Sequence, residues 1–131
     1  MSSIFTRLVT GEIPCHKLAE NEHYFAFLDL RPLNPGHALV IPKKEVDYVF
    51  DLDDETLKGL FVFAKQVARA VKKTVPCRKV AIVVYGLEVP HAHVHLIPIH
   101  GVAGELDFRN AKKAEEEELK SVAEKIRAQL V

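Results

Sequence analysis

Short apolar segments separated by turn residues run along the chain and predict a β-sheet. Tyr24 to Leu30 is apolar at both sets of alternate positions, which predicts a strand packed on both faces, with Asp29 as its one charged member. Further strands are predicted near 16–19 and at 37–41. Val80 to Val84 is a β-branched run typical of a buried central strand. The short connection from Gly86 to Pro90 then leads into a strand at 91–96, which predicts two adjacent antiparallel neighbours.

Helical periodicity marks three other segments. Residues 53–74 carry apolar side chains at the spacing of one helix stripe, preceded by aspartates suited to capping its start. A second helix is predicted at about 112–130, and a short one at 3–10. Strands and helices in this order predict an α+β fold class, with an antiparallel sheet of about five strands, a long central helix and a C-terminal helix.

Composition narrows the class of protein. A chain of 131 residues, 48% of them hydrophobic, is long enough for one core. We expect a domain at 3–108 and a C-terminal helical extension at 109–131 packed on it. Eighteen basic and eighteen acidic side chains cancel, which argues against a nucleic-acid polymer or a membrane as partner. Without an apolar run of membrane-spanning length or a signal-peptide pattern, we expect a cytoplasmic protein in which Cys15 and Cys77 stay reduced.

Three histidines alternate in the segment P-H-A-H-V-H-L-I-P. On a strand, alternation would aim His91, His93 and His95 at one face, about 6.6 Å apart, while the intervening apolar residues enter the core. Imidazole is the side chain that serves as nucleophile, base, acid or metal ligand near neutral pH.

Three interpretations of this row are open at this point. It could be purely structural. It could hold a metal, with His37, Glu88 or His100 completing the ligand set. It could also perform nucleophilic catalysis at phosphorus, in which a neutral imidazole attacks while its neighbours stabilise the phosphoryl charge. His93, flanked on both sides, is then the natural nucleophile. His16, His23 and His100 are expected at the surface.

At these residues the chain resembles the histidine triad family of nucleotide hydrolases and transferases. That family's signature is H-φ-H-φ-H-φ-φ with φ apolar, and here it is H-A-H-V-H-L-I. The segments I-F-T-R-L-V-T-G-E-I-P and F-A-F-L-D-L-R-P-L-N-P-G-H-A-L-V-I-P-K-K are similar to the family's N-terminal half, in the same order. The resemblance covers roughly residues 3–101 and implies an antiparallel sheet and a homodimer whose sheets join.

The resemblance also implies roles for individual residues. His93 is similar to the nucleophile that takes up a nucleoside monophosphate, His95 and His37 to the histidines that contact the α-phosphate, and His91 to the member that orients its neighbours. Asp29 is similar to the carboxylate that binds the ribose hydroxyls. Four apolar residues match positions that line the family's purine slot: Ile4, Phe5, Phe27 and Leu30.

The chain departs from the family pattern just before the triad. Members carry a longer loop of the form N-x-G-x-x-x-G-Q-[S/T]-V-x-H, where this chain has Y-G-L-E-V-P-H. Glu88 stands in place of the hydroxyl residue and is expected in the nucleotide site. A glutamate there could protonate an amine or alcohol leaving group, or could point to solvent. Phe5 and Leu8 lie where some members carry a zinc-binding cysteine pair, so that zinc is not expected.

Together these features predict a hydrolase, a nucleotide phosphoramidase or nucleotidyl hydrolase. It would act at the α-phosphate of a purine nucleotide through a covalent histidine intermediate, with no metal and no cofactor. A metal-binding protein that uses the H-x-H-x-H strand and a non-catalytic nucleotide-binding module are the alternatives.

Overall fold

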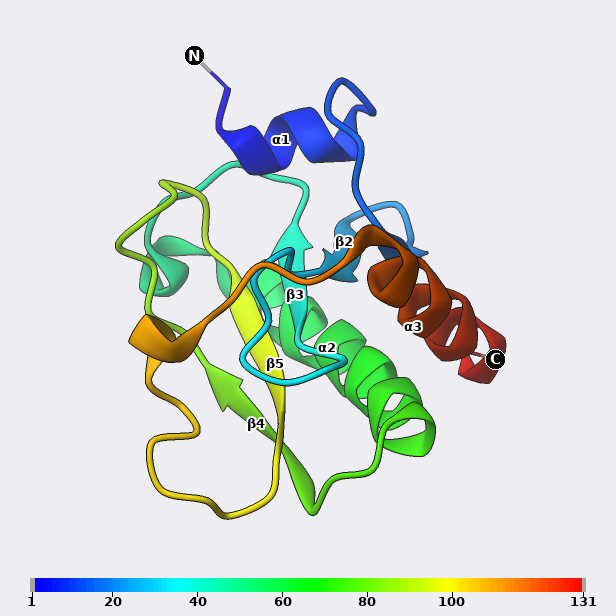
Figure 1. Cartoon of the computed structure of the whole chain (residues 1–131). Coiled ribbons are helices and arrows are strands. Elements are labelled where there is room, and N and C mark those ends of the chain that lie inside the picture. The colour runs from blue at the N-terminus through cyan, green and yellow to red at the C-terminus, as the bar shows by residue number, and fades with distance from the viewer. Residues whose placement is uncertain (1, 131) are drawn as a thin grey trace.

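The computed structural model describes residues 2–130 and is built on a five-stranded antiparallel sheet with strand order β1-β2-β3-β5-β4 (Figure 1). The elements along the chain are α1 (Ile4–Val9), β1 (Lys17–Glu20), β2 (Tyr24–Leu28), β3 (Ala38–Pro42), η1 (Val49–Asp51), α2 (Asp54–Thr74), β4 (Lys79–Val83), β5 (Val94–Ile99), η2 (Phe108–Asn110) and α3 (Glu116–Gln129). The predicted α+β fold class is confirmed.

Each face of the sheet has its own apolar cluster. On one face, Ala26, Val40 and Leu96 pack with the buried stripe of α2 and with Ile126 of α3. On the other face the cluster is mostly aromatic and consists of Phe5, Phe25, Phe27, Leu39 and Ile41. β2 is buried at every position, as its double apolar pattern predicts. Alternate residues of one strand thus support a helical layer and, opposite it, the side on which α1 lies.

The sequence prediction for β4 was wrong about its place in the sheet. This strand is at the edge, paired with β5 alone, and Ile82 remains 52% exposed. β-Branched residues fit any pleated surface, so such a run indicates a strand without indicating its neighbours. The antiparallel pairing of β4 with β5 is confirmed.

The histidine segment also differs from prediction. β5 begins only at Val94, so His91 and His93 lie in the approach to the strand and His95 alone lies within it. The alternation nevertheless continues, since Ala92, Val94 and Leu96 all enter the α2 core. The expected row of three evenly spaced imidazoles does not form, because the irregular backbone before the strand turns the first ring elsewhere.

The C-terminal segment returns across the molecule before α3 begins. Arg31 Nη2 donates to the carbonyl oxygen of Ala111 at 3.1 Å, and the backbone N–H of Ala114 donates to Leu30 at 3.0 Å. α3 then packs on α2 and β1. A boundary at residue 108 remains a prediction. Between residues 2 and 130, every helix is too short or too polar to cross a bilayer.

Candidate active site

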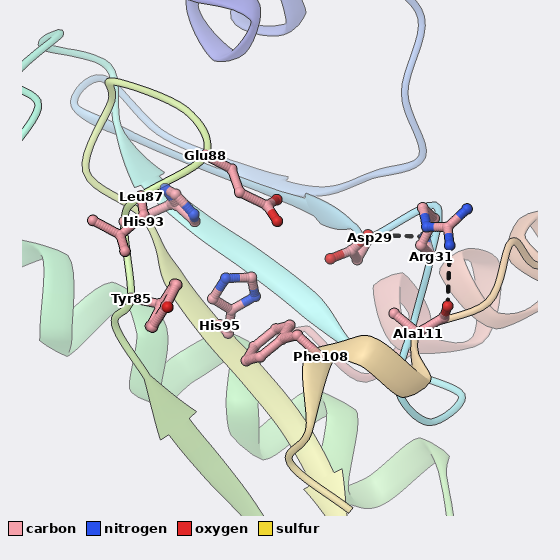
Figure 2. Close-up of a pocket in the computed structure, with 10 residues that line it drawn as sticks. Asp29, Arg31, Tyr85, Leu87, Glu88, His93, His95, Phe108 and Ala111 are labelled. Carbon is pink, nitrogen blue, oxygen red and sulfur yellow. Dashed lines mark hydrogen bonds between the residues drawn. The ribbon is translucent and has the colours of Figure 1, made fainter.

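A pocket opens where β5, the segment after β2 and the segment around η2 meet (Figure 2). Its lining residues are Asp29, Arg31, Tyr85, Gly86, Leu87, Glu88, His93, His95, Phe108 and Ala111. Two of the three triad histidines therefore face it, together with both carboxylates that the sequence predicts for the nucleotide site.

His93 is held in one orientation by the backbone that precedes it. Its Nδ1–H donates to the carbonyl oxygen of His91 at 2.8 Å, and the edge of the Phe5 ring lies against it with centroids 5.0 Å apart. A carbonyl oxygen only accepts, so this contact fixes the proton of the neutral ring on Nδ1. The Nε2 atom is left with an unprotonated lone pair, which is the form a nucleophile requires.

His91 does not share this pocket. Its ring is fully buried between α1 and the end of β3, where Nε2–H donates to the carbonyl oxygen of Pro42 at 2.7 Å and Nδ1 accepts from the Ser3 hydroxyl at 2.8 Å. Its contribution to the pocket is its carbonyl oxygen. The family-based expectation that His91 orients its neighbours remains a prediction; its contact with His93 is made by the backbone carbonyl and not by the imidazole.

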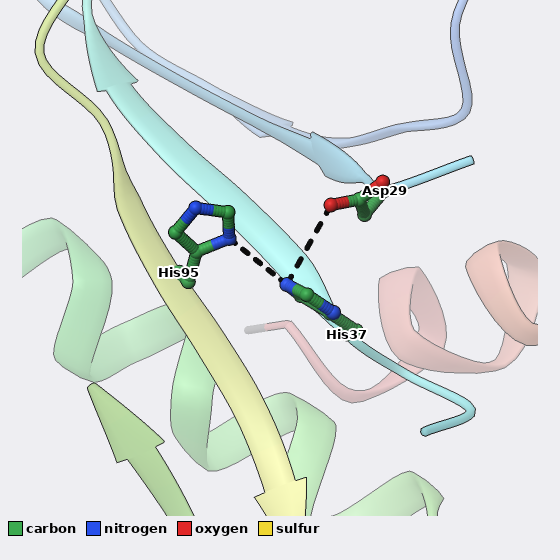
Figure 3. Close-up of side chains that lie close together, drawn as sticks. All are labelled: Asp29, His37 and His95. Atoms are coloured by element: carbon green, nitrogen blue, oxygen red, sulfur yellow. Dashed lines mark hydrogen bonds and ion pairs between the residues drawn. The ribbon is translucent and has the colours of Figure 1, made fainter. Parts of the chain in front are cut away.

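His37 and His95 form a relay with defined proton positions (Figure 3). The backbone N–H of Leu33 donates to His37 Nδ1 at 3.1 Å, so His37 carries its proton on Nε2. That Nε2–H donates to His95 Nδ1 at 3.0 Å. His95 must then carry its own proton on Nε2. Neighbouring rings, His93 and His95 with centroids 5.1 Å apart, therefore hold opposite tautomers, one with a lone pair at Nε2 and one with an N–H there.

Burial keeps both members of the relay neutral. Desolvation lowers the pKa of His37 to about 4, and desolvation with the neighbouring His37 and His93 lowers the pKa of His95 to about 3. At neutral pH, His95 therefore presents a neutral N–H donor to the pocket and not a cation.

Asp29, His37 and His95 bring three potential ligand atoms within 4.8 Å of one another, which raises the question of a metal. A histidine that binds a metal through Nε2 normally donates its Nδ1–H to an acceptor. Here Nδ1 of His37 faces a donor, the Leu33 N–H. If His37 bound a cation through Nε2, its proton would move to Nδ1 and two N–H groups would point at each other. The proton positions fit a hydrogen-bonded relay and do not fit a metal site.

The charge in the pocket is arranged around two carboxylates and one guanidinium. Asp29 directly follows β2, as predicted, and accepts from the Arg31 backbone N–H at 2.8 Å. Burial raises the pKa of Asp29; the Arg31 N–H opposes this and the negative charge of Glu88 adds to it. With His95 neutral, the pocket offers an uncharged N–H donor beside a single arginine.

The four apolar residues predicted for the purine slot lie outside this pocket lining. Phe5 and Phe27 are buried in the aromatic cluster with rings edge to face, 5.5 Å apart, and Phe5 supports the His93 ring. Ile4 and Leu30 are each 48% exposed. The purine slot remains a prediction.

Several pocket residues were not predicted as site residues, although Tyr85 and Leu87 lie in the loop that departs from the family pattern. Arg31, Tyr85, Leu87 and Phe108 come from three separate segments. Phe108 packs its ring on His95 with centroids 4.8 Å apart, and its position is set by η2, which no apolar period marks. An arginine two residues after Asp29 is the only one of these features that spacing alone could have suggested.

The other histidines lie away from the pocket. His16 pairs with Glu116 of α3 at 3.0 Å, and His23 lies 3.8 Å from Glu22. His23 and His100 are exposed, as predicted for both, while His16 is half-buried under α3.

Comparison with known proteins identifies the family of this chain. The HIT domain family model matches residues 10–102, and the chain belongs to the histidine triad family. The chain is 40% identical over 100 residues to a 16.1 kDa HIT-like protein of Mycoplasma pneumoniae, spanning 72% of this chain and 69% of that protein. It is also 40% identical over 96 residues to adenosine 5'-monophosphoramidase HNT1 of Saccharomyces cerevisiae, spanning 72% of this chain and 61% of that protein.

The fold comparison extends over nearly the whole chain. The crystal structure of a Hit-like protein from Bartonella henselae superposes with a TM-score of 0.87 at 34% sequence identity, covering 98% of this chain and 96% of the other. The likeness thus includes α3, which lies beyond the residues that the family model matches.

Proposed function

We propose that the protein hydrolyses nucleoside phosphoramidates at the α-phosphate by nucleophilic catalysis at His93. The observation that supports this best is the pair of opposite tautomers at one pocket. His93 presents a lone pair at Nε2 because its Nδ1–H is bonded to a carbonyl, and His95 presents an N–H because the relay from Leu33 occupies its Nδ1. A lone pair beside a donor is what attack at phosphorus and stabilisation of the phosphoryl oxygens require.

The reaction proceeds in two steps. His93 Nε2 forms a bond to phosphorus while the bond from phosphorus to the leaving nitrogen breaks, and the departing amine takes up a proton. The His93 ring then carries a positive charge, which the His91 carbonyl oxygen at 2.8 Å and the carboxylate of Asp29 stabilise. In the second step a water oxygen bonds to phosphorus, one water proton passes to the Glu88 carboxylate left by the first step, the bond to Nε2 breaks, and the nucleoside monophosphate leaves.

Glu88 supplies the proton to the leaving amine in this proposal. It lines the pocket between His93 and Asp29, and its side chain points into it (Figure 2). Once it has given up its proton, the Glu88 carboxylate would also repel a polyphosphate leaving group. The substrate favoured is therefore a phosphoramidate with a basic amine, and the similar yeast protein is named an adenosine 5'-monophosphoramidase.

Asp29 accepts hydrogen bonds from the ribose hydroxyls, and a purine lies against Ile4, Phe5, Phe27 and Leu30. Asp29 supports this because it lines the pocket and can accept further hydrogen bonds, since the Arg31 N–H occupies only its Oδ1 atom. Phe5 supports the position of the purine because its ring packs against the His93 ring, with centroids 5.0 Å apart.

We also propose that two copies pair along β4. This edge strand bonds to β5 on one side, and exposed apolar residues continue from Ile82 onto α2 at Phe61 and Val62. An apolar open edge is a surface that proteins normally cover. An apolar hollow runs from Phe61 past Tyr85 to His93, so a second copy seated there would lie next to the active site.

Turnover of adenosine 5'-phosphoramidate by metal-free protein tests the proposed reaction. Wild-type protein treated with EDTA should release adenosine monophosphate at an unchanged rate, and His93→Ala should lose at least about 1000-fold in turnover. An active His93→Ala variant, or loss of activity with EDTA that zinc restores, would refute the mechanism. Nucleotide binding without turnover would identify a binding module instead.

A further inference from the structure

Four polar residues from three distant parts of the chain meet behind the triad. Ser3 and Thr6 belong to the start of α1, Glu45 to the loop after β3, and His91 to the approach to β5. We call these four residues the anchor network. The Ser3 hydroxyl lies 2.8 Å from His91 Nδ1, and the Glu45 carboxylate accepts from the Ser3 backbone N–H at 2.7 Å and from the Thr6 hydroxyl at 2.6 Å.

The shortest contacts assign a partner to each proton of the network, since the alternatives, Ser3 Oγ to Thr6 Oγ1 at 3.5 Å and Thr6 Oγ1 to His91 Nδ1 at 3.4 Å, are longer. His91 Nε2–H donates to the Pro42 carbonyl, so Nδ1 can only accept. The Ser3 oxygen accepts the Thr6 backbone N–H at 3.1 Å, and its own proton goes to His91 Nδ1. The Thr6 hydroxyl proton goes to Glu45. Ser3, although near the start of the chain, is only 7% exposed, because it sits between α1 and His91.

The same network fixes the peptide unit that orients the nucleophile. The N–H of Ala92 donates to the Val46 carbonyl at 2.7 Å, next to Glu45, while the carbonyl of that peptide unit, on His91, accepts the His93 Nδ1–H at 2.8 Å. The His91 ring is held at both nitrogens. Rotation of this peptide unit would require the ring of His91 or the loop at 43–46 to move with it.

We propose that Ser3, Thr6 and Glu45 are positioning residues for the reaction, which act through His91 to hold the lone pair of His93 toward the pocket. The expected changes in kcat rest on the proposed function, whereas the expected tautomers of His91 and His93 do not depend on it. α1 is then a part of the active-site scaffold, although none of its side chains belongs to the pocket lining. Hydrogen bonds to Glu45 lower its pKa, which keeps it an acceptor over the working pH range.

Kinetics and histidine tautomers test the anchor network together. Ser3→Ala should lower kcat about tenfold, the effect of one lost hydrogen bond to the scaffold, with KM changed by less than about twofold. Ser3→Thr, which keeps the hydroxyl, should restore most of kcat. Ser2→Ala is the matched control, since Ser2 is exposed one residue away. Glu45→Gln should lower kcat, and Glu12→Gln should not, because Glu12 is an exposed residue paired with Arg7 at the surface.

Side-chain ¹⁵N NMR measures the same network without any substrate. In wild-type protein, His91 should be protonated on Nε2 and His93 on Nδ1, and Ser3→Ala should shift His93 toward a mixture of tautomers. Wild-type protein that shows these tautomers without turnover would leave the network intact and remove the proposed function. The inference is overturned if Ser3→Ala and Glu45→Gln keep the wild-type tautomers and kcat, or if Ser2→Ala and Glu12→Gln lower kcat equally.

Discussion

The two histidines that face the pocket are held in different ways. His93 is fixed by a backbone carbonyl, and that carbonyl belongs to a peptide unit tied to the β3 loop and to α1. His95 is fixed by another side chain, His37, whose own orientation depends on one backbone N–H. Backbone contacts fix the orientation of His93, the proposed nucleophile, whereas a side-chain relay fixes the proton position of His95, the proposed donor. The orientation of His95 is therefore the more sensitive of the two to side-chain substitution.

Substitutions in the relay should have the largest effect on kcat among those that distinguish the roles of His93 and His95. His95→Asn removes the N–H next to the nucleophile and should lower kcat by up to about 1000-fold. His37→Asn, which disturbs only the tautomer of His95, should cost less, about tenfold. Steady-state kinetics with adenosine 5'-phosphoramidate measures both. Equal losses of kcat for the two variants would show that His37 contacts the substrate itself. An unchanged kcat in His95→Asn would show that the relay does not contribute to the reaction.

Acid should destabilise the folded protein through the relay, because its buried histidines are neutral in the fold and must take up a proton at low pH. The pKa of His37 is about 4 in the folded protein and about 6.5 when unfolded, so between these values the unfolded chain binds the proton first. The stability contributed by neutral His37 is complete above pH 6.5 and is lost as the pH falls toward 4, by up to about 3 kcal/mol.

Urea unfolding from pH 7 to pH 4 measures this slope. His37→Asn should flatten it, while His23→Asn, a substitution at an exposed histidine, should leave it unchanged. An identical slope in the wild-type and His37→Asn proteins would contradict the burial argument.

Glu88 lies opposite the two histidines, and its removal should depend on the leaving group. Glu88→Gln should lower kcat about 100-fold for a phosphoramidate, whose nitrogen must gain a proton to leave, and much less for a p-nitrophenyl ester, whose phenol leaves as the anion. Single-turnover rates over a series of such leaving groups give this dependence. A uniform loss over the series would assign Glu88 to binding and not to proton transfer.

The smallest effect on chemistry is expected at the β4 edge. Ile82→Lys should convert a dimer into a monomer, because a charge at an exposed strand edge opposes pairing. Light scattering after size-exclusion chromatography measures the mass. Val102→Lys is a matched control on an exposed loop. A wild-type monomer, or a dimeric Ile82→Lys protein, would contradict pairing along this strand.

The sequence predicts well those features that repeat along the chain. The double apolar pattern of β2, the stripe of α2 and the alternation of Ala92, Val94 and Leu96 against the histidines each follow from one local period, and the structure confirms them. Asp29 at the end of β2 was predictable because a charge disrupts an otherwise apolar run.

Features that depend on a single long-range contact could not be predicted. The tautomer of His95 depends on the Leu33 N–H, and the orientation of His93 depends on a network that reaches Ser3, 88 residues before His91. The edge position of β4 depends on which strand pairs with β3. Phe108 contacts His95 from a segment that has no apolar periodicity. Propensity and spacing carry no information on such partners.

Trapping the covalent intermediate tests the central claim most directly. Metal-free protein mixed with an adenosine phosphoramidate, quenched within milliseconds and digested, should give a peptide whose mass is increased by one adenylyl group, with fragmentation placing it on His93. An adduct on His95 or on any other residue, or turnover with no adduct at any time point, would contradict the assignment of His93 as the nucleophile.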